Sequence, residues 1–178
     1  MGKSADSPQV SRLPTAAPMS LPIRPRRNRQ SAAIRGLVRE TRLSAQQFIL
    51  PLFITEGRVE EPIASMPGCQ RWSLDGLVRE AISAWEAGVR AIVLFPRIAD
   101  DLKTRQAEEA WNDAGLVPRA IKALKAALPD LAVITDVALD PYNSDGHDGL
   151  VSDDGQILND ETVDVLCQQA LSHARAGA

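Results

Sequence analysis

Three short apolar runs, separated by amphipathic helical patterns, limit this chain to an α/β fold. The runs begin near residues 48, 90 and 131, about 41 residues apart, which suits a helix that crosses over between parallel strands. Each run is continuously apolar, as strands are when both faces of a sheet are covered. We therefore predict a β-α-β-α-β-α order and a parallel sheet. The predicted strands are residues 48–54, 90–95 and 131–139.

Each predicted helix has a start or a stop signal. Ser73 is expected to cap the first helix and Gly88 to end it. Pro118 is expected to open the second helix, because proline fits the first helical turn. Asn159 is expected to cap the third helix and Gly177 to end it. The apolar face predicted for this third helix consists of Val163, Leu166, Ala170 and Ala174.

The first 42 residues differ from the remainder in charge. They carry nine lysines and arginines and two carboxylates, a net charge of +7. Residues 43–178 carry eleven lysines and arginines and 21 carboxylates, a net charge of −10. Many prolines prevent regular packing, so residues 1–20 are predicted to be disordered, with a short helix at 31–41. A basic run of this kind could bind nucleic acid, but it lacks interleaved aromatic side chains. We interpret residues 1–42 as an arm that lies across an acidic neighbouring subunit.

Composition argues against several classes of protein. No stretch approaches the roughly 20 apolar residues of a membrane span, so no membrane partner is expected. The start of the chain lacks the apolar core of a secretory signal peptide, and a cytoplasmic location is expected. The only two cysteines, Cys69 and Cys167, are far apart, which argues against a disulfide framework and a cysteine zinc site.

The third predicted strand runs into a loop that combines carboxylates with an imidazole. These residues are Asp136, Asp140, Asp145, His147 and Asp148. Active sites of α/β folds lie at the carboxyl ends of strands, and closely spaced carboxylates repel one another unless a positive charge lies among them. Asp140 and Asp148 are therefore candidates to hold a hard cation such as Mg²⁺, or to act as acid and base. On spacing alone, Asp136 could equally be a carboxylate that caps loop amides.

The remaining histidine and the lysines give weaker signals. His173 is expected on the surface of the last helix. Lys122 and Lys125 fall on a solvated helix face, and Lys103 lies in a charged loop. None of these lysines has the apolar surroundings that lower a lysine pKa for Schiff-base chemistry.

Several segments resemble the porphobilinogen synthase family, also called 5-aminolevulinate dehydratases. The loop matches in residues 134–142 (ITDVALDPY) and 146–149 (GHDG), and the last helix in residues 158–165 (LNDETVDV). Shorter matching segments are residues 24–27, 38–41, 51–53, 65–68, 94–96, 169–171 and 176–178. The resemblance therefore covers the chain from about residue 22 to its last residue.

The resemblance implies a (β/α)₈ TIM barrel, preceded by an arm that wraps a neighbouring subunit, usually in a homo-octamer. It implies a hydro-lyase that condenses two 5-aminolevulinate molecules, with loss of two waters, to porphobilinogen for the synthesis of haem and chlorophyll. By resemblance, Asp136 belongs to the catalytic set, where it orients substrate or handles protons. Ser144 and His147 are assigned to supporting the loop.

One departure from the family pattern concerns the metal. Family members that use catalytic zinc hold it with three cysteines, and the corresponding positions here are Ala138, Asp140 and Asp148. Without thiolates, and with a methyl group at one ligand position, a tetrahedral zinc site is excluded on chemical grounds. The loop resembles the aspartate-type branch, which is associated with Mg²⁺ and sometimes K⁺. Asp140 and Asp148 are expected to hold such a cation or to meet the substrate ammonium directly.

A second departure concerns the other half of the barrel. The family's Schiff-base lysines and substrate-carboxylate arginines lie in that half, which these 178 residues do not include. Residues 43–178 are expected to form about three βα units, to stop before a fourth strand and to be inactive alone. The alternative is a non-catalytic binding or assembly module that uses the basic arm and the acidic loop.

Overall fold

The structure, a computed structural model, describes residues 25–178. The chain divides into two compact units, of which the first ends at Arg42. The described part of this first unit contains a 3-10 turn, η1 (Arg27–Arg29), and a short helix, α1 (Ala32–Leu37). The predicted disorder of residues 1–20 lies outside the described residues.

Helix α1 begins where the sequence predicts a helix. The Ser31 side chain caps it by accepting a hydrogen bond from the Ile34 N–H at 3.2 Å. The helix ends at Leu37 instead of continuing to Thr41, which agrees with the low helix propensity of Gly36 in its last turn.

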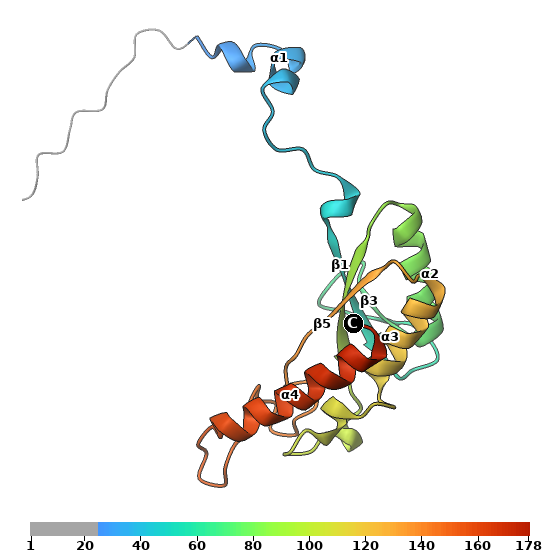
Figure 1. The fold of residues 1–178 in the computed structure, drawn as a ribbon, viewed down its shortest axis with the longest axis vertical. Helices are drawn as coiled ribbons and strands as arrows, with labels where there is room; N and C mark the ends of the chain where they lie inside the picture. The colour runs from blue at the N-terminus through green and yellow to red at the C-terminus, as the bar shows by residue number, and fades with distance from the viewer. Residues whose placement is uncertain (1–24) are drawn as a thin grey trace, which may run out of the picture. The chain divides into compact units, whose positions relative to one another are not determined.

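The second unit, residues 43–178, is built on one five-stranded sheet (Figure 1). The strands are β1 (Ile49–Thr55), β2 (Glu61–Pro62), β3 (Gln70–Trp72), β4 (Ala91–Arg97) and β5 (Ala132–Thr135). The helices are α2 (Leu74–Glu86), α3 (Leu116–Ala127) and α4 (Asn159–Ala176), with 3-10 turns η2 (Ala45–Gln47), η3 (Asp100–Leu102) and η4 (Glu108–Trp111). The order β1-α2-β4-α3-β5-α4 confirms the predicted alternation.

The parallel strands are aligned so that their carboxyl ends share one edge of the sheet. The strand order is β2-β3-β1-β4-β5, in which β1 pairs with β4, and β4 with β5, in parallel. The β1–β4 pairing runs from Ile49 opposite Ala91 to Thr55 opposite Arg97. Strand β5 pairs with β4 over four residues and ends at Thr135, so the predicted strand 131–139 is too long. Residues 136–139 belong to the loop instead.

Two prolines, Pro51 and Pro96, lie within the paired parallel strands of the sheet. Strand β4 continues through Pro96 to Arg97, although the sequence predicts an end at Pro96. Pro51 lies in the half of β1 that pairs with β4 alone, because β3 pairs only with Phe53 and Ile54. A proline with no N–H to donate is tolerated where one side of the strand is open.

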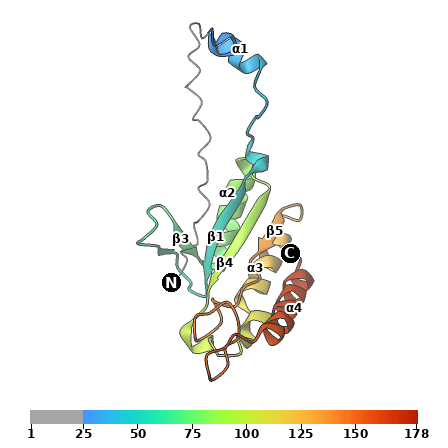
Figure 2. The same cartoon turned by 90° about the vertical axis from the view of Figure 1, so that its left-hand side faces the viewer.

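Helices cover one face of this sheet within the described residues. Helix α3 lies between α2 and α4 on that face (Figure 2). The strand side chains that form the core with these helices are Leu52, Ile54, Ile92, Leu94 and Val133. By contrast Ile134, which alternates with Val133, is 39% exposed. The expectation that both faces are covered is therefore wrong for the part of the chain described, since an apolar pattern does not specify what covers the second face.

Of the five predicted helix starts and stops, three are confirmed, including the Ser73 cap of α2, and two are corrected. Gly88 (φ +97°) and Gly177 (φ +114°) adopt left-handed conformations at the ends of α2 and α4. Helix α3 begins two residues before Pro118, which occupies its first turn. Asn159 is the first residue of α4 and makes no capping bond, because Leu158 holds the cap position.

The buried face of α4 differs from the apolar face predicted for it. Val163, a member of the predicted face, is 48% exposed, and Leu171 is 55% exposed. The residues that α4 buries are Thr162, Val165, Gln169, Ser172, His173 and Ala176. Hydrophobic periodicity failed here because α4 packs its polar side chains against a loop whose backbone groups need partners.

In residues 25–178, no helix has both the length and the apolar character that a membrane crossing requires.

The cap of α2 provides a test of how this helix begins. Replacing Ser73 with Ala should lower the free energy of unfolding by about 1 kcal/mol, because the Gly76 N–H loses the Ser73 oxygen that lies 3.1 Å away. Urea denaturation followed by circular dichroism measures the loss. Ser83→Ala, at an exposed position of the same helix, is the control and should change it by less than about 0.5 kcal/mol. Equal losses in the two variants would contradict the capping role.

Candidate active site

A cavity of about 410 Å³ lies where the carboxyl ends of the parallel strands meet. Phe53 at the end of β1 and Phe95 at the end of β4 contribute apolar rings, whose centroids are 5.7 Å apart. The charged residues that line the cavity are Arg71, Arg97, Lys103, Asp136 and Asp140. The cavity therefore combines an apolar surface with charges of both signs.

The carboxylates of the loop after β5 lie close enough to influence one another. Asp136 follows the last residue of β5, and Asp140 lies four residues further along the loop. Partial burial raises the pKa of Asp140 above its usual range, and the neighbouring charge of Asp148 raises this pKa further. A hydrogen bond with Asp148 and the charge of Asp136 act in the same direction. The structure thus brings together three of the carboxylates that the sequence singles out.

The fourth carboxylate of the loop has a different partner. Asp145 accepts a hydrogen bond from the Arg105 guanidinium at 3.3 Å. The same guanidinium donates to Asp153 at 2.6 Å and to the Val151 carbonyl at 3.0 Å. Asp145 therefore joins two segments of the loop region, and it is not among the residues that line the cavity.

Asn143 fixes the shape of the loop from within. Its side chain is buried, with 1% exposed, and its amide oxygen accepts a hydrogen bond from the Asp145 N–H at 2.7 Å. Its amide nitrogen donates to the Gly149 carbonyl at 3.3 Å, which closes residues 143–149 into a compact turn. Sequence reasoning missed Asn143, although an Asn-Ser-Asp-Gly segment is a recognisable signal for an Asx turn.

The two residues predicted to support the loop, Ser144 and His147, make different contacts within it. His147 accepts a hydrogen bond from the Gly149 N–H at its Nδ1 atom, at 2.9 Å. Ser144 acts through its backbone N–H, which donates to the Thr104 carbonyl at 3.0 Å. The Thr104 N–H in turn donates to the Tyr142 carbonyl, so this pairing attaches the acidic loop to the loop after β4.

Helix α4 attaches both ends of the loop through buried polar side chains. Gln169 donates from Nε2 to the Ala138 carbonyl at 3.1 Å, and His173 Nδ1 lies 3.0 Å from the Thr135 hydroxyl. At the other end of the loop, the Thr162 hydroxyl accepts a hydrogen bond from the N–H of residue 150 at 3.0 Å. The prediction of a surface position for His173 is wrong, because only 2% of this residue is exposed. Its hydrogen bond to Thr135 compensates part of the cost of burying the ring.

Lys103 is a member of the cavity that sequence reasoning assigned only to a charged loop. Its side chain is 28% exposed, and its ammonium group lies 2.9 Å from Asp100 within the turn η3. The adjacent residue Thr104 pairs with Asn143, which brings this segment beside the acidic loop. That pairing is a tertiary contact, and no local sequence pattern indicates it.

The donor set of the loop suits a hard cation better than zinc. Among residues 25–178, no three His, Cys, Asp or Glu side chains come close enough together to hold a metal ion. Both cysteines are free and exposed. Asp140 and Asp148 are neighbouring oxygen donors, which Mg²⁺ accepts when water or substrate completes its shell. The metal therefore remains a prediction.

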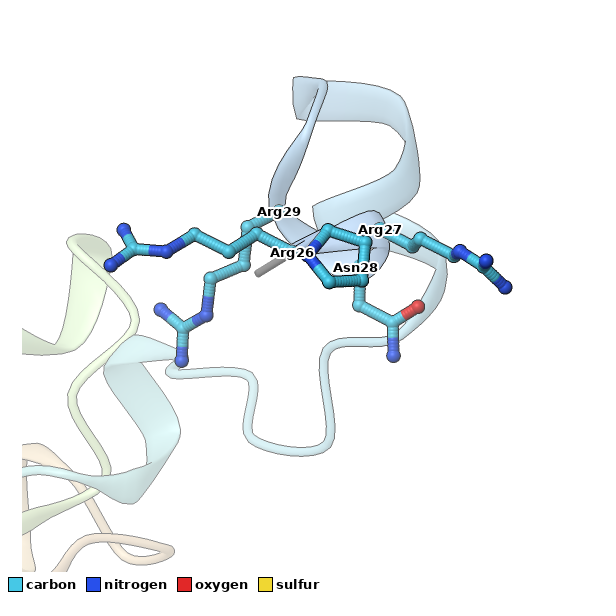
Figure 3. Close-up of a pocket in the computed structure, with 5 residues that line it drawn as sticks. Arg26, Arg27, Asn28 and Arg29 are labelled. Atoms are coloured by element: carbon cyan, nitrogen blue, oxygen red, sulfur yellow. The ribbon is translucent and has the colours of Figure 1, made fainter. Parts of the chain in front are cut away.

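Within the described part of the first unit, Arg26, Arg27 and Arg29 are all exposed. Together with Pro25 and Asn28 they surround a shallow hollow, and the side chains of Arg26 and Arg27 extend in opposite directions (Figure 3). These groups make this part of the arm strongly basic. The predicted contact with a neighbouring subunit stays a prediction.

Comparison with known proteins places this geometry in a family. The family model described as delta-aminolevulinic acid dehydratase matches residues 22–178. The chain belongs to the delta-aminolevulinic acid dehydratase family. This membership confirms the resemblance seen in the loop and the last helix, since porphobilinogen synthase is the other name of these dehydratases.

Plant dehydratases match most of this chain. The enzyme of Selaginella martensii is 56% identical over 167 residues, which are 93% of this chain and 40% of that protein. The enzyme of Glycine max is 51% identical over 187 residues, and the match covers 99% of this chain and 45% of the Glycine max protein. The chain thus spans less than half the length of these curated relatives.

A solved dehydratase supports the same fold. The crystal structure of the Toxoplasma gondii enzyme, in complex with its reaction product porphobilinogen, matches with a TM-score of 0.86 and 49% sequence identity. The match covers 89% of this chain and 45% of that one. The predicted fold class, an α/β chain that forms the first part of a TIM-type barrel, is confirmed.

The comparisons correct the expected cytoplasmic location. The relatives from Selaginella martensii, Physcomitrium patens, Glycine max and Arabidopsis thaliana are all named chloroplastic. The prediction rested on the missing apolar core of a secretory signal. A plastid transit peptide is rich in serine and arginine and poor in acidic residues, and it needs no such core. The lack of an apolar secretory segment therefore does not argue against a plastid location.

The interaction between Asp140 and Asp148 can be tested by titration. Replacing Asp148 with Asn should lower the pKa of Asp140 towards its usual range, because the variant removes one of the neighbouring negative charges. Carboxyl-carbon NMR titration measures the change. Asp145→Asn is the control and should leave the Asp140 titration in place, since Asp145 pairs with Arg105 instead. An unchanged Asp140 titration in Asp148→Asn would contradict the proximity of the two groups.

The buried ring of His173 predicts a loss of stability in acid. Burial lowers the pKa of His173, so the unfolded chain takes up a proton at a higher pH than the folded chain. The free energy of unfolding should therefore decrease as the pH falls below about 6.5, the ordinary histidine value, until the folded ring is also protonated. Urea unfolding between pH 8 and pH 5 measures this decrease. This acid decrease in the free energy of unfolding should be smaller in His173→Phe and unchanged in His147→Asn. A decrease that is unchanged in His173→Phe and smaller in His147→Asn would exclude His173 as its source.

Proposed function

We propose that this chain forms the first part of the barrel of a porphobilinogen synthase, which joins two 5-aminolevulinate molecules with loss of two waters. The observation that carries the proposal is the acidic loop beside a cavity at the carboxyl ends of the strands. In barrel enzymes this edge of the sheet is where catalytic groups lie. The match to a dehydratase structure that contains porphobilinogen supports the same assignment.

The charges of the cavity suit a substrate that carries both an ammonium and a carboxylate group. Asp136 and Asp140 offer negative charge on one side, and Arg71 and Lys103 offer positive charge in the same cavity. Asp140, with its raised pKa, gains from a nearby cation, because a positive charge relieves its repulsion from Asp148. An aminolevulinate ammonium is such a cation, so we assign Asp140 and Asp148 to binding it or a metal ion.

The same loop can move protons during the condensation. Loss of water from an amino ketone requires a group that donates a proton to the departing oxygen and one that accepts a proton. The raised pKa belongs to Asp140, whose carboxyl group retains its proton to a higher pH than an ordinary one and so suits a donor role beside Asp136. We assign the proton-handling and orienting role to Asp136, which lies directly at the end of β5 and lines the cavity.

The chemistry of the donors favours Mg²⁺ or K⁺ as the associated cation. Carboxylate oxygens are the ligands that these hard cations prefer, whereas the zinc-type site of the family needs thiolates. When bound, such a cation would supply positive charge at Asp140 and Asp148. It would lower the electrostatic cost of holding the two carboxylates together.

The whole enzyme is proposed to be a homo-oligomer in a plastid. The basic segment around Arg26, Arg27 and Arg29 suits contact with an acidic surface, and residues 43–178 of this chain carry a net charge of −10, from eleven basic against 21 acidic residues. A neighbouring copy would therefore be a suitable partner for the arm, in an octamer by resemblance to the family. The chloroplastic names of the plant relatives support the plastid.

A chimeric enzyme tests this function. The segment of the Selaginella martensii dehydratase that matches this chain, 167 residues long, is replaced by the corresponding residues of this chain. The chimera should form porphobilinogen, and Asp136→Asn should lower its kcat by at least about 100-fold, because a proton-handling group is lost. Colorimetric assay of the pyrrole product measures both.

Asp145→Asn is the matched control for this experiment. It removes the same charge from the same loop, but Asp145 pairs with Arg105 and does not line the cavity. Its kcat should stay within about threefold of the parent chimera. A folded chimera without activity, or an Asp136→Asn variant as active as the parent, would contradict the proposed function.

A further inference from the structure

Helix α4 buries polar side chains where a helix that packs on a sheet usually buries apolar ones. Gln169 is fully buried, and His173, one helical turn further along, is 2% exposed. Both side chains reach the segment that leaves β5. Gln169 donates to the Ala138 carbonyl at 3.1 Å, and His173 contacts the Thr135 hydroxyl at 3.0 Å.

These two contacts lie on either side of Asp136. Thr135 precedes this carboxylate directly, and Ala138 follows it by two residues. The Thr162 hydroxyl, from the first turn of the same helix, binds the N–H of Leu150 at 3.0 Å, at the far end of the loop. One helix therefore contacts the Thr135 side chain before the acidic loop, the Ala138 carbonyl within it and the Leu150 N–H after it.

Gln169 and His173 are not the side chains that would make the folded protein most stable at these positions. Among the described residues, the Gln169 Oε1 atom and the His173 Nε2 atom have no hydrogen-bond partner, although both atoms are buried. Burial of an unpaired polar atom is unfavourable, and an apolar side chain of similar size would avoid this cost. What distinguishes Gln169 and His173 from apolar side chains is their contact with the loop, at Ala138 and at Thr135.

The loop needs to be held because its own charges oppose its conformation. Asp136 and Asp140 both line the cavity, and Asp148 lies in the same short loop, so three negative charges share a small region. Repulsion of this kind pushes carboxylates apart unless the backbone between them is fixed. The bond from Gln169 fixes that backbone at Ala138, between Asp136 and Asp140.

We propose that Gln169 and His173 are positioning residues, which hold the chain on both sides of Asp136, through the Ala138 carbonyl and the Thr135 side chain, so that Asp136 and Asp140 stay at the cavity. This inference rests on the proposed function for its effect on catalysis, but the mechanical part concerns the loop alone. Neither side chain lines the cavity, so both act through the residues that they hold.

The first test compares two buried hydrogen bonds of the same helix in the chimeric enzyme. Gln169→Leu removes the bond to the loop. Ser172→Ala removes a bond of the Ser172 hydroxyl, 1% exposed, to Asp113 at 2.6 Å, outside the loop. Gln169→Leu should lower kcat about tenfold with KM changed less, whereas Ser172→Ala should stay within about twofold for both.

The second test uses rescue at His173. His173→Phe keeps a ring but loses the contact with Thr135, and kcat should fall about tenfold. His173→Asn places an amide group near the position of Nδ1, so it can again bond to the Thr135 hydroxyl. The Asn variant should recover most of the lost kcat. A Phe variant that is as active as the Asn variant would overturn the positioning role of His173.

Amide hydrogen exchange, followed by mass spectrometry, gives a readout that does not depend on activity. Exchange in residues 136–150 should be faster in Gln169→Leu than in the parent chimera, and unchanged in Ser172→Ala. Equal exchange in the two variants would overturn the positioning role of Gln169, even if the chimera forms porphobilinogen. A folded parent chimera that forms no porphobilinogen would overturn the proposed function, while the exchange data would still decide the mechanical part.

Discussion

The mutual repulsion of three carboxylates is the constraint on which the rest of this site depends. Asp136, Asp140 and Asp148 lie in one short loop, and partial burial together with the charges of Asp148 and Asp136 raises the pKa of Asp140. The fold opposes this repulsion in two ways. The parallel sheet presents the start of the loop at a fixed edge, and helix α4 holds backbone groups at both ends of the loop. The loop is thus a charged feature held by neutral hydrogen bonds from α4 and by the ion pair of Asp145 with Arg105.

The alternation of strands and helices could be predicted from the sequence because it depends on local patterns. Apolar runs gave the positions of β1, β4 and β5, and Ser73 and Gly88 gave the limits of α2. Even so, β5 ends four residues before the predicted bound at Leu139, since an apolar run does not reveal where pairing with a neighbouring strand stops.

The site could be predicted only in part. The acidic loop was evident from its composition, whereas the roles of His173 and Gln169 were not. Both are polar residues that a hydrophobic pattern assigns to the surface, yet α4 buries them against the loop. Lys103 was missed for another reason, because its place in the cavity depends on the pairing of Thr104 with Asn143, about 40 residues later in the chain.

That pairing has a consequence for how the site can change in evolution. Thr104 and the segment from Tyr142 to Ser144 exchange backbone hydrogen bonds, so the loop after β4 and the acidic loop form one mechanical piece. An insertion between Lys103 and Thr104, or between Asp140 and Tyr142, would move the cation Lys103 and the carboxylate Asp140 relative to each other. The paired residues therefore tie the position of Lys103 to that of the acidic loop.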